Sequence, residues 1–181
     1  MQPVLDPNKL VFLDESSVNL AYTRLYGRAL KNEKINEGVK DVRFQRKSIL
    51  STVRLNGETC PIIFDGTLDQ HLFAHYVKTE LKPALADDDI LILDGCSVHK
   101  SKLVLQTFEE CGVNAVFLPP YSPDLNPIEL FWAKVKTFLK KAKARTNDAL
   151  ENAINSASDW VSTADILGWF KHCGYYLHFS E

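Results

Sequence analysis

The feature that most limits how this chain can fold is a pair of four-residue apolar runs, each followed directly by an aspartate. Residues 10–13 (LVFL) precede Asp14, and residues 90–93 (ILIL) precede Asp94. Continuous apolar runs of this length are typical of strands that are covered on both faces. If the two strands lie side by side, about 4.8 Å apart, their aspartates meet in the crevice where such sheets bind ligands. We therefore predict that each aspartate stands at the carboxyl end of its strand.

Two carboxylates placed together in this way repel each other strongly unless a cation lies between them. The alternative is that each aspartate only begins a turn, which is reasonable for one of them and less so for both. His99 follows Asp94 by five residues. A lone histidine at that position is equally consistent with a structural role and with a role beside the carboxylate.

The remaining patterns predict further strands and helices. Residues 48–55 and 58–64 flank Asn56-Gly57, the strongest short hairpin signal, and so predict two antiparallel strands. Residues 115–118 predict a short buried strand. Helices are expected from apolar spacing and from start and stop signals at residues 67–81, 100–111, 147–161 and 163–172.

Another helix is predicted within residues 119–145, which read PPYSPDLNPIELFWAKVKTFLKKAKAR. The prolines hold extended and turn conformations, and Asn126-Pro127 supplies an N-cap followed by proline at the first helical position. Glu129 then lies at the rim of the buried face. The core-facing stripe consists of apolar residues at helical spacing, namely Ile128, Phe131, Val135 and Phe138.

Glu129 has two interpretations. As the third helical residue it would close a capping box with Asn126. Alternatively, it is a functional carboxylate on a face that also carries Lys136, Lys140 and Lys143, all within about 40° of it on a helical wheel. The chain has six cations and no acid between Glu129 and Asp148, which favours a polyanionic partner over a merely solvated face.

A second basic segment, residues 21–54, carries nine cations, including Arg46 and Lys47, against three acids. It is a candidate surface for phosphate groups, although a solvated loop explains it equally well. Two other groups of potential ligands are assigned structural roles. His71 and His75 lack an accompanying HExxH motif, and the acidic run 87–89 is interpreted as a solvated turn before a strand.

Composition limits the remaining choices. A chain of 181 residues with 45% hydrophobic content suffices for one well-buried domain and hardly for two. The formal charge of −2 and the pI near 6.2 provide no global field for nucleic acid, so such binding must come from local patches. Four widely spaced cysteines favour reduced thiols in a cytosolic protein. There is no signal peptide and no apolar run of about 18 residues, so neither export nor membrane insertion is expected.

Asp14, Asp94 and Glu129 resemble the acidic triad of DDE transposases of the mariner-like superfamily, in particular its bacterial insertion-sequence branch. The setting of each acid carries the resemblance: FLDES around Asp14, a strand before Asp94 with His99-Lys100 five residues later, and LPPYSPDLNPIELFW around Glu129. WFKHCGYY extends the resemblance close to the end of the chain. This chain departs from the family at Gly95-Cys96, where Asn-Ala is common.

The resemblance implies an α/β, RNase H-like fold, with a mixed five-stranded sheet whose first three strands are antiparallel and which is flanked by helices. It assigns catalysis and the binding of two Mg²⁺ ions, for which Mn²⁺ would substitute, to Asp14, Asp94 and Glu129. His99 and Asn126 are expected as neighbours of that site. Mg²⁺ prefers oxygen ligands, and two ions can activate a water or a 3′-hydroxyl and stabilise the leaving oxygen. The implied function is cleavage of transposon DNA ends and strand transfer into target DNA.

The resemblance also predicts organisation and partners. Residues 1–9 are expected to be a linker stub and residues 10–181 the catalytic domain, without the amino-terminal helix-turn-helix region that reads transposon ends. That region is then expected on a separate polypeptide or elsewhere in a longer chain. We expect a homodimer on DNA in the bacterial cytoplasm, associated with the nucleoid when bound. The expected DNA contacts are the basic residues Lys136, Lys140, Lys143, Arg46 and Lys47. The alternatives are a non-catalytic DNA-binding or dimerising fragment that regulates an intact transposase, and a nuclease without a role in transposition.

Overall fold

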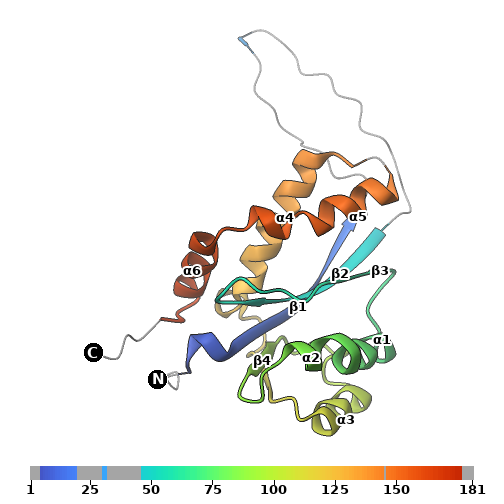
Figure 1. Ribbon diagram of the computed structural model, residues 1–181, viewed down its shortest axis with the longest axis vertical. Helices are drawn as coiled ribbons and strands as arrows, with labels where there is room; N and C mark the ends of the chain where they lie inside the picture. The colour runs from blue at the N-terminus through green and yellow to red at the C-terminus, as the bar shows by residue number, and fades with distance from the viewer. Residues whose placement is uncertain (1–4, 20–29, 32–45, 145, 177–181) are drawn as a thin grey trace.

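A mixed five-stranded sheet lies between two layers of helices in the computed structural model, which describes residues 5–19, 30–31, 46–144 and 146–176 (Figure 1). The strands are β1 (Leu10–Asn19), β2 (Arg46–Arg54), β3 (Ile62–Asp65), β4 (Ile90–Leu93) and β5 (Ala115–Phe117), in the order β3-β2-β1-β4-β5. The pairs β1–β2 and β2–β3 are antiparallel, whereas β1–β4 and β4–β5 are parallel. The predicted sheet is therefore confirmed.

The helices divide between the two faces of the sheet (Figure 1). One layer contains α1 (Gln70–Tyr76), which continues through a π-helical turn (Val77–Leu81) into α2 (Lys82–Ala84), and α3 (Lys102–Cys111). The other contains α4 (Pro127–Ala142), α5 (Asn147–Asn155) and α6 (Thr163–His172). None of the helices in the described ranges is long and apolar enough to cross a membrane.

Alternation along β1 explains why this strand is apolar throughout its first half. Leu10 and Phe12 belong to the core beneath α4, α5 and α6, whereas Val11 and Leu13 belong to the core beneath α1 and α3. All four are at most 1% exposed. Because both faces of the strand are covered, each side chain is removed from water and contributes to stability.

The position of Asp14 in its strand differs from the prediction. Asp94 does follow the end of β4, but Asp14 lies in the middle of β1, which continues to Asn19. Pairing of β1 with β4 stops at Leu13↔Leu93, while its pairing with β2 continues to Asn19↔Arg46. The long antiparallel partner therefore extends β1 beyond the point where the parallel partner ends.

Other boundaries shift for local reasons. The Asn56-Gly57 turn forms, with Gly57 at a φ of 93°, but β3 begins only after Pro61, which has no amide hydrogen for a ladder. The helix expected from residue 67 starts after the N-cap Asp69. It also continues past Pro83 to Ala84, because the wide π-helical turn precedes the proline and tolerates its missing donor. The helix expected to reach residue 161 ends at Asn155, followed by a 3₁₀ turn.

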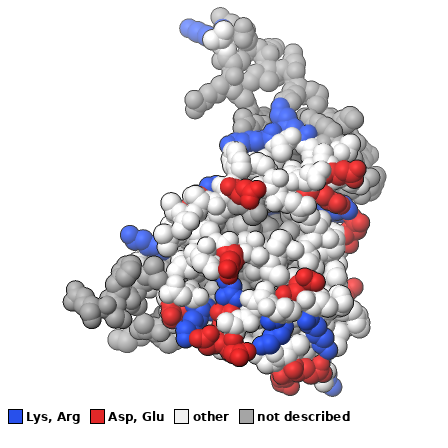
Figure 2. All heavy atoms as spheres, in the orientation of Figure 1, with Lys and Arg blue, Asp and Glu red and all other residues white. Residues whose placement is uncertain are grey.

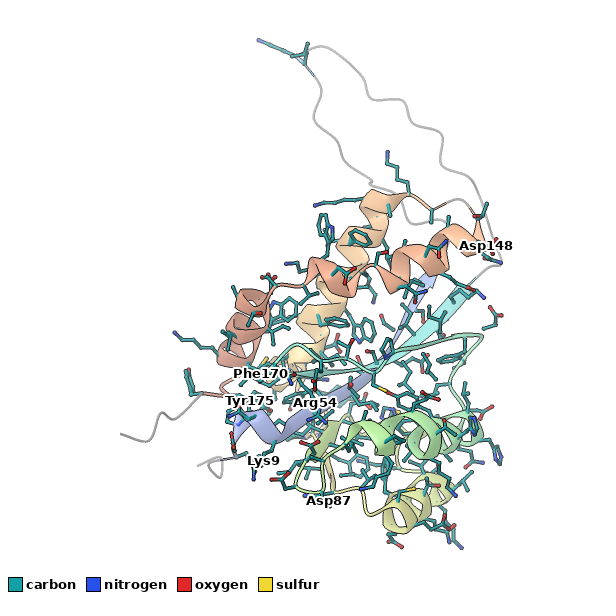
Figure 3. The ribbon with its side chains drawn as sticks, in the orientation of Figure 1. Lys9, Arg54, Asp87, Asp148, Phe170 and Tyr175 are labelled. Carbon is teal, nitrogen blue, oxygen red and sulfur yellow. The ribbon has the colours of Figure 1, made fainter. Side chains whose placement is uncertain are left out.

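A cluster of aromatic rings fixes the segment after α6 against β1. Phe12 meets Phe170 and Tyr175 edge to face, with ring centroids 5.3 and 5.1 Å apart (Figure 3). The hydroxyl of Tyr175 donates a hydrogen bond of 2.8 Å to the carbonyl oxygen of Leu125. The carboxyl-terminal segment thus holds the loop that leads into α4.

An ion pair joins the end of β2 to the turn before β4. Both terminal nitrogens of Arg54 donate to the carboxylate of Asp89, at 2.9 and 2.6 Å, and the side chains are only 13% and 5% exposed. Asp88 of the same acidic run pairs with Lys9 at 2.7 Å. Figure 3 labels Lys9, Arg54 and Asp87 around this corner.

We predict that Asp89→Ala lowers the free energy of unfolding by about 2–3 kcal/mol, because it leaves a partly buried guanidinium without its carboxylate. Denaturation by urea measures this change. Asp87→Ala is the matched control, since that side chain is fully exposed and its loss should cost less than about 0.5 kcal/mol. Equal losses in the two variants would show that the Arg54–Asp89 pair is not structural.

Candidate active site

The register between β1 and β4 brings two aspartates to the same edge of the parallel pair. Leu13 pairs with Leu93, and the next residue in each chain segment is Asp14 or Asp94. By the alternation of side chains, Asp14 shares its face with Phe12 and so lies on the side covered by α4. Asp14 within β1 and Asp94 directly after β4 therefore each follow the last paired residue of the two strands.

Helix α4 adds Glu129 from the same side of the sheet. The helix begins at Pro127 after the N-cap Asn126, and Glu129 is its third residue and is exposed. Neither half of a capping box forms. The side chain of Asn126 makes no capping hydrogen bond, and its backbone amide donates instead to the carbonyl oxygen of Pro123 at 3.0 Å. The capping interpretation of Glu129 is therefore wrong.

Trp132 is a site residue that the sequence patterns did not identify. Its indole nitrogen donates a hydrogen bond of 3.1 Å to Oδ2 of Asp14, and its side chain is 3% exposed. Trp132 lies three residues after Glu129, so both occupy one face of α4. This spacing was the sequence signal that could have identified Trp132, because it places an indole N–H donor on the same helical face as Glu129.

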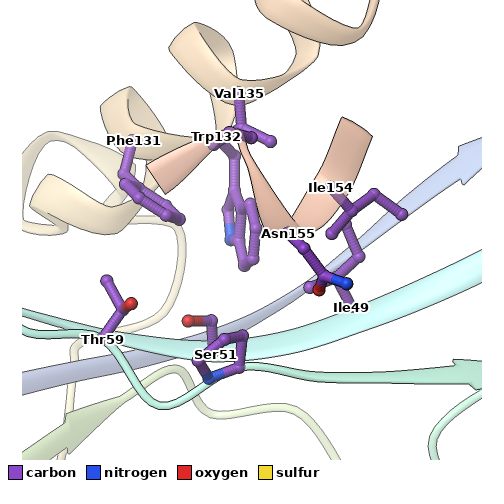
Figure 4. Close-up of a pocket in the computed structure, with 10 residues that line it drawn as sticks. Ile49, Ser51, Thr59, Phe131, Trp132, Val135, Ile154 and Asn155 are labelled. Atoms are coloured by element: carbon purple, nitrogen blue, oxygen red, sulfur yellow. The ribbon is translucent and has the colours of Figure 1, made fainter. Parts of the chain in front are cut away.

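The indole of Trp132 also lines a mainly apolar pocket of about 70 Å³ (Figure 4). Its walls come from β2, α4 and α5 and include Ile49, Phe131 and Ile154. None of its lining residues is ionisable in the physiological range. Trp132 thus contacts both this pocket and the carboxylate of Asp14.

The two aspartates have opposite electrostatic environments. Burial raises the pKa of Asp14 to about 7, and repulsion from Glu129 and Asp94 adds to this effect. The pKa of Asp94 falls to about 2, first because of its hydrogen bond with His99. Nδ1 of His99 lies 2.8 Å from Oδ1 of Asp94, and that oxygen also accepts the backbone amide of Cys96 at 3.1 Å.

His99 is a buried partner of Asp94. It is 2% exposed and packs against Phe73, with ring centroids 4.9 Å apart. Burial acts to lower the pKa of His99, but hydrogen bonds with Asp94 and Cys96 together raise it to about 9. Its other nitrogen, Nε2, is buried without a hydrogen-bond partner. His99 is therefore placed to hold Asp94 in its ionised form.

An open groove of about 420 Å³ connects Asp94 with Glu129. Gly95, Cys96, Lys100, Asn126 and the proline-rich loop 118–123 complete its lining. Among the described residues, Asp94, Cys96 and His99 form the one group of three potential metal ligands whose donor atoms all lie within 4.8 Å of one another. The carboxylates of Asp14, Asp94 and Glu129 are therefore more widely spread than that group.

The lysines of α4 differ in their surroundings. Lys140 is exposed and Lys136 partly buried. Lys143 follows the end of α4 in a left-handed conformation (φ 51°), so it leaves the helical face on which it was predicted. Lys134 pairs with Asp165, and Nζ of Lys141 lies 4.2 Å from the ring centroid of Trp160. The prediction of six cations without a counter-charge is therefore wrong for Lys134.

The second basic segment is described only in part. Its cations Arg24, Arg28, Lys34, Lys40 and Arg43 lie outside the described residues. Arg46 donates to the hydroxyl of Ser17, and Lys47 pairs with Asp65 at 3.0 Å and with Glu151 at 2.9 Å. On the face in Figure 2, acidic and basic residues are interspersed, with basic ones near the upper end of α4.

Comparison with known proteins identifies a family that this chain matches. Residues 9–151 match the family described as DDE superfamily endonuclease. The transposable element Tcb1 transposase of Caenorhabditis briggsae is 30% identical over 83 residues, which cover 44% of this chain and 30% of that protein. The match thus spans less than a third of the relative's length.

Solved structures of the Mos1 transposase share the fold. Its paired-end complex with the left transposon end aligns with a TM-score of 0.76 and 14% identity, over 95% of this chain and 57% of that one. A mariner paired-end complex with Mn gives 0.72 and 12%, over 91% and 52%. The isolated catalytic domain gives 0.69 and 11%, over 92% and 77%. The sheet and its flanking helices are thus an RNase H-like fold.

The raised pKa of Asp14 predicts a pH-dependent stability. Because the folded state binds this proton more tightly than the unfolded chain, Asp14 destabilises the fold progressively as pH rises from about 4 to about 7. In EDTA, Asp14→Asn should be more stable than the parent by about 2–4 kcal/mol at pH 8 and equally stable near pH 4. Denaturation at the two pH values measures the difference. A stability difference between the two proteins that is the same at pH 4 and pH 8 would refute the raised pKa of Asp14.

Proposed function

The chain belongs to the DDE superfamily of endonucleases, and from this we infer that it is a transposase catalytic domain that cleaves transposon ends and transfers the cut strand into target DNA. The observation that carries the proposal is the Leu13↔Leu93 register, which sets Asp14 beside Asp94 under a helix that contributes Glu129. The names of the relatives agree with a role on transposon DNA.

The three carboxylates fit divalent metal as ligands. They offer only oxygen atoms, which Mg²⁺ and Mn²⁺ prefer. Burial raises the pKa of Asp14, with a further contribution from repulsion by Glu129 and Asp94, and a bound cation would relieve that repulsion. Because their donor atoms do not converge as tightly as a single-ion cluster, we propose that they hold two neighbouring ions. When bound, such ions supply activation of a water or 3′-hydroxyl nucleophile and stabilisation of the leaving oxygen.

The other residues of the site orient these ligands. Trp132 donates its indole N–H to Oδ2 of Asp14 and so fixes the orientation of this carboxylate. His99 keeps Asp94 ionised and fixes its Oδ1. We propose that both act by positioning, in the way that the hydrogen-bond partners of metal ligands commonly do. Cleavage and strand transfer then use one site and differ only in whether water or a 3′-hydroxyl attacks.

Lys136, Lys140 and Lys143 are the proposed contacts to DNA phosphates, since Lys136 and Lys140 lie beyond Glu129 along α4 and Lys143 is the residue that caps its carboxyl end. Arg46 and Lys47 are less suited, because their side chains already engage Ser17 and two carboxylates, respectively. We further propose that two copies act together on paired ends, by analogy with the paired-end complexes of the Mos1 transposase. Placement in the bacterial insertion-sequence branch is also part of this proposal.

The test of this function is Glu129→Gln. Glutamine keeps the size of glutamate but is a much poorer ligand for Mg²⁺, so nicking of supercoiled plasmid DNA in Mg²⁺ or Mn²⁺ should fall by at least about a hundredfold. Stability should change by less than about 1 kcal/mol in Glu129→Gln and also in Glu129→Ala, since no capping box is removed. The exposed Glu109→Gln on α3 is the control. Nicking by the parent that persists in Glu129→Gln would remove Glu129 from the site.

If these lysines contact phosphates, their removal should weaken the dependence of DNA binding on salt. Replacing the three α4 lysines by alanine should reduce the log–log slope of affinity against salt concentration by nearly 1 for each lysine that neutralises a phosphate. Fluorescence anisotropy with a labelled duplex measures the slope. A control of equal charge change replaces three lysines on the opposite helical layer, namely Lys78, Lys82 and Lys102. The same slope in both triple variants would mean that the α4 lysines bind no phosphate.

A further inference from the structure

The turn between β4 and α3 contains a donor set that includes one residue of the acidic site, Asp94, and two residues outside the acidic triad. Asp94, Cys96 and His99 place a carboxylate oxygen, a thiol sulfur and an imidazole nitrogen within 4.8 Å of one another. All three come from the short segment between Leu93 and the N-cap Ser101. Backbone hydrogen bonds hold this segment, including Lys100 N–H to the carbonyl oxygen of Cys96 at 3.2 Å.

The orientation of each group suits a shared ligand. Nδ1 of His99 faces Asp94, whereas Nε2 is buried without a hydrogen-bond partner, so Nδ1 is the nitrogen directed at the other two donors. Cys96 is exposed, and both Cys96 and Asp94 line the groove. The carboxylate and the thiol are therefore open to solvent at the groove, and the imidazole of His99 lies buried beside them.

The three donor atoms of this cluster favour a different class of cation from the one that the acidic site favours. Thiolate, imidazole and carboxylate are the ligands of Zn²⁺, and sites with three protein ligands leave the fourth position to solvent. Mg²⁺ takes oxygen ligands and gains little from sulfur or imidazole nitrogen. The cluster thus favours thiophilic ions, and binding releases the thiol proton of Cys96 and the Nδ1 proton of His99 to solvent.

We propose that Asp94, Cys96 and His99 form a second metal site, specific for Zn²⁺ and similar thiophilic ions, that shares Asp94 with the acidic site. Because one carboxylate then serves two sites, Zn²⁺ withdraws Asp94 from the Mg²⁺ ligands and inhibits the enzyme. The inhibition rests on the proposed transposase function, whereas the binding of Zn²⁺ does not.

Binding is tested by alkylating the full chain with N-ethylmaleimide and following each cysteine by peptide mass spectrometry. Zn²⁺ at ten times its Kd should slow the modification of Cys96 about tenfold, and Mg²⁺ should not. Cys60 and Cys111 are only partly buried and serve as internal controls whose rates should stay constant. Unchanged alkylation of Cys96 in excess Zn²⁺ would overturn the site.

Two variants separate coordination from indirect protection. His99→Gln should abolish the protection of Cys96, and Cys96→Ala should abolish the ultraviolet thiolate-to-metal absorption that Cd²⁺ produces with the parent protein. Persistence of that Cd²⁺ absorption in Cys96→Ala would assign it to another thiol and refute the proposal. No DNA is present in these measurements, so they decide the site even if the chain cleaves nothing.

Inhibition is measured separately, as the ratio of plasmid nicking in Mg²⁺ with and without added Zn²⁺. Each protein is compared with its own rate in the absence of Zn²⁺. The Zn²⁺ concentration for half-inhibition should rise at least about tenfold in Cys96→Ala. If the parent and Cys96→Ala are inhibited equally, Zn²⁺ acts elsewhere and the sharing of Asp94 is refuted.

Discussion

The parallel pairing of β1 with β4 is the interaction on which the acidic edge of this structure depends. Four apolar residues of β1 are covered on both faces, which fixes the strand between two cores. The paired register then leaves Asp14 and Asp94 side by side. Burial of apolar surface contributes about 25 cal/mol per Å², and this burial holds the two strands together although their carboxylates repel each other.

The two aspartates each follow the last paired residue of β1 and β4, but their hydrogen-bond partners and charged neighbours differ. Asp94 has a histidine partner and a backbone amide, so it is ionised without any further ligand. Asp14 has an indole N–H on one oxygen and acidic neighbours, and it loses hydration without gaining a cation. The difference follows from what surrounds each strand, namely the turn that carries His99 and the helix that carries Trp132.

Local patterns were sufficient to predict most of the individual strands and the start of α4, because the apolar runs, the Asn56-Gly57 turn and the proline after Asn126 act over a few residues. The topology of the mixed five-stranded sheet was expected only from the resemblance to the family. The features that escaped prediction depend on distant partners. β1 extends past Asp14 because β2 pairs with it, and the indole of Trp132 reaches a carboxylate 118 residues away in sequence. Lys134 finds its counter-charge in α6, which no charge count within α4 could include. The capping box failed because the preceding 3₁₀ turn already occupied the amide of Asn126.

The hydrogen bond from Trp132 to Asp14 also gives the chain an optical property. Indole emission shifts with the charge beside the ring and with the partner of its nitrogen. Trp160 is 44% exposed beneath Lys141, and Trp169 packs against Phe131, so their surroundings are distinct from a buried carboxylate. Trp132 is thus a natural fluorophore that is hydrogen-bonded to one carboxylate of the site. Its emission wavelength therefore reports the ionisation state of Asp14 without any added label.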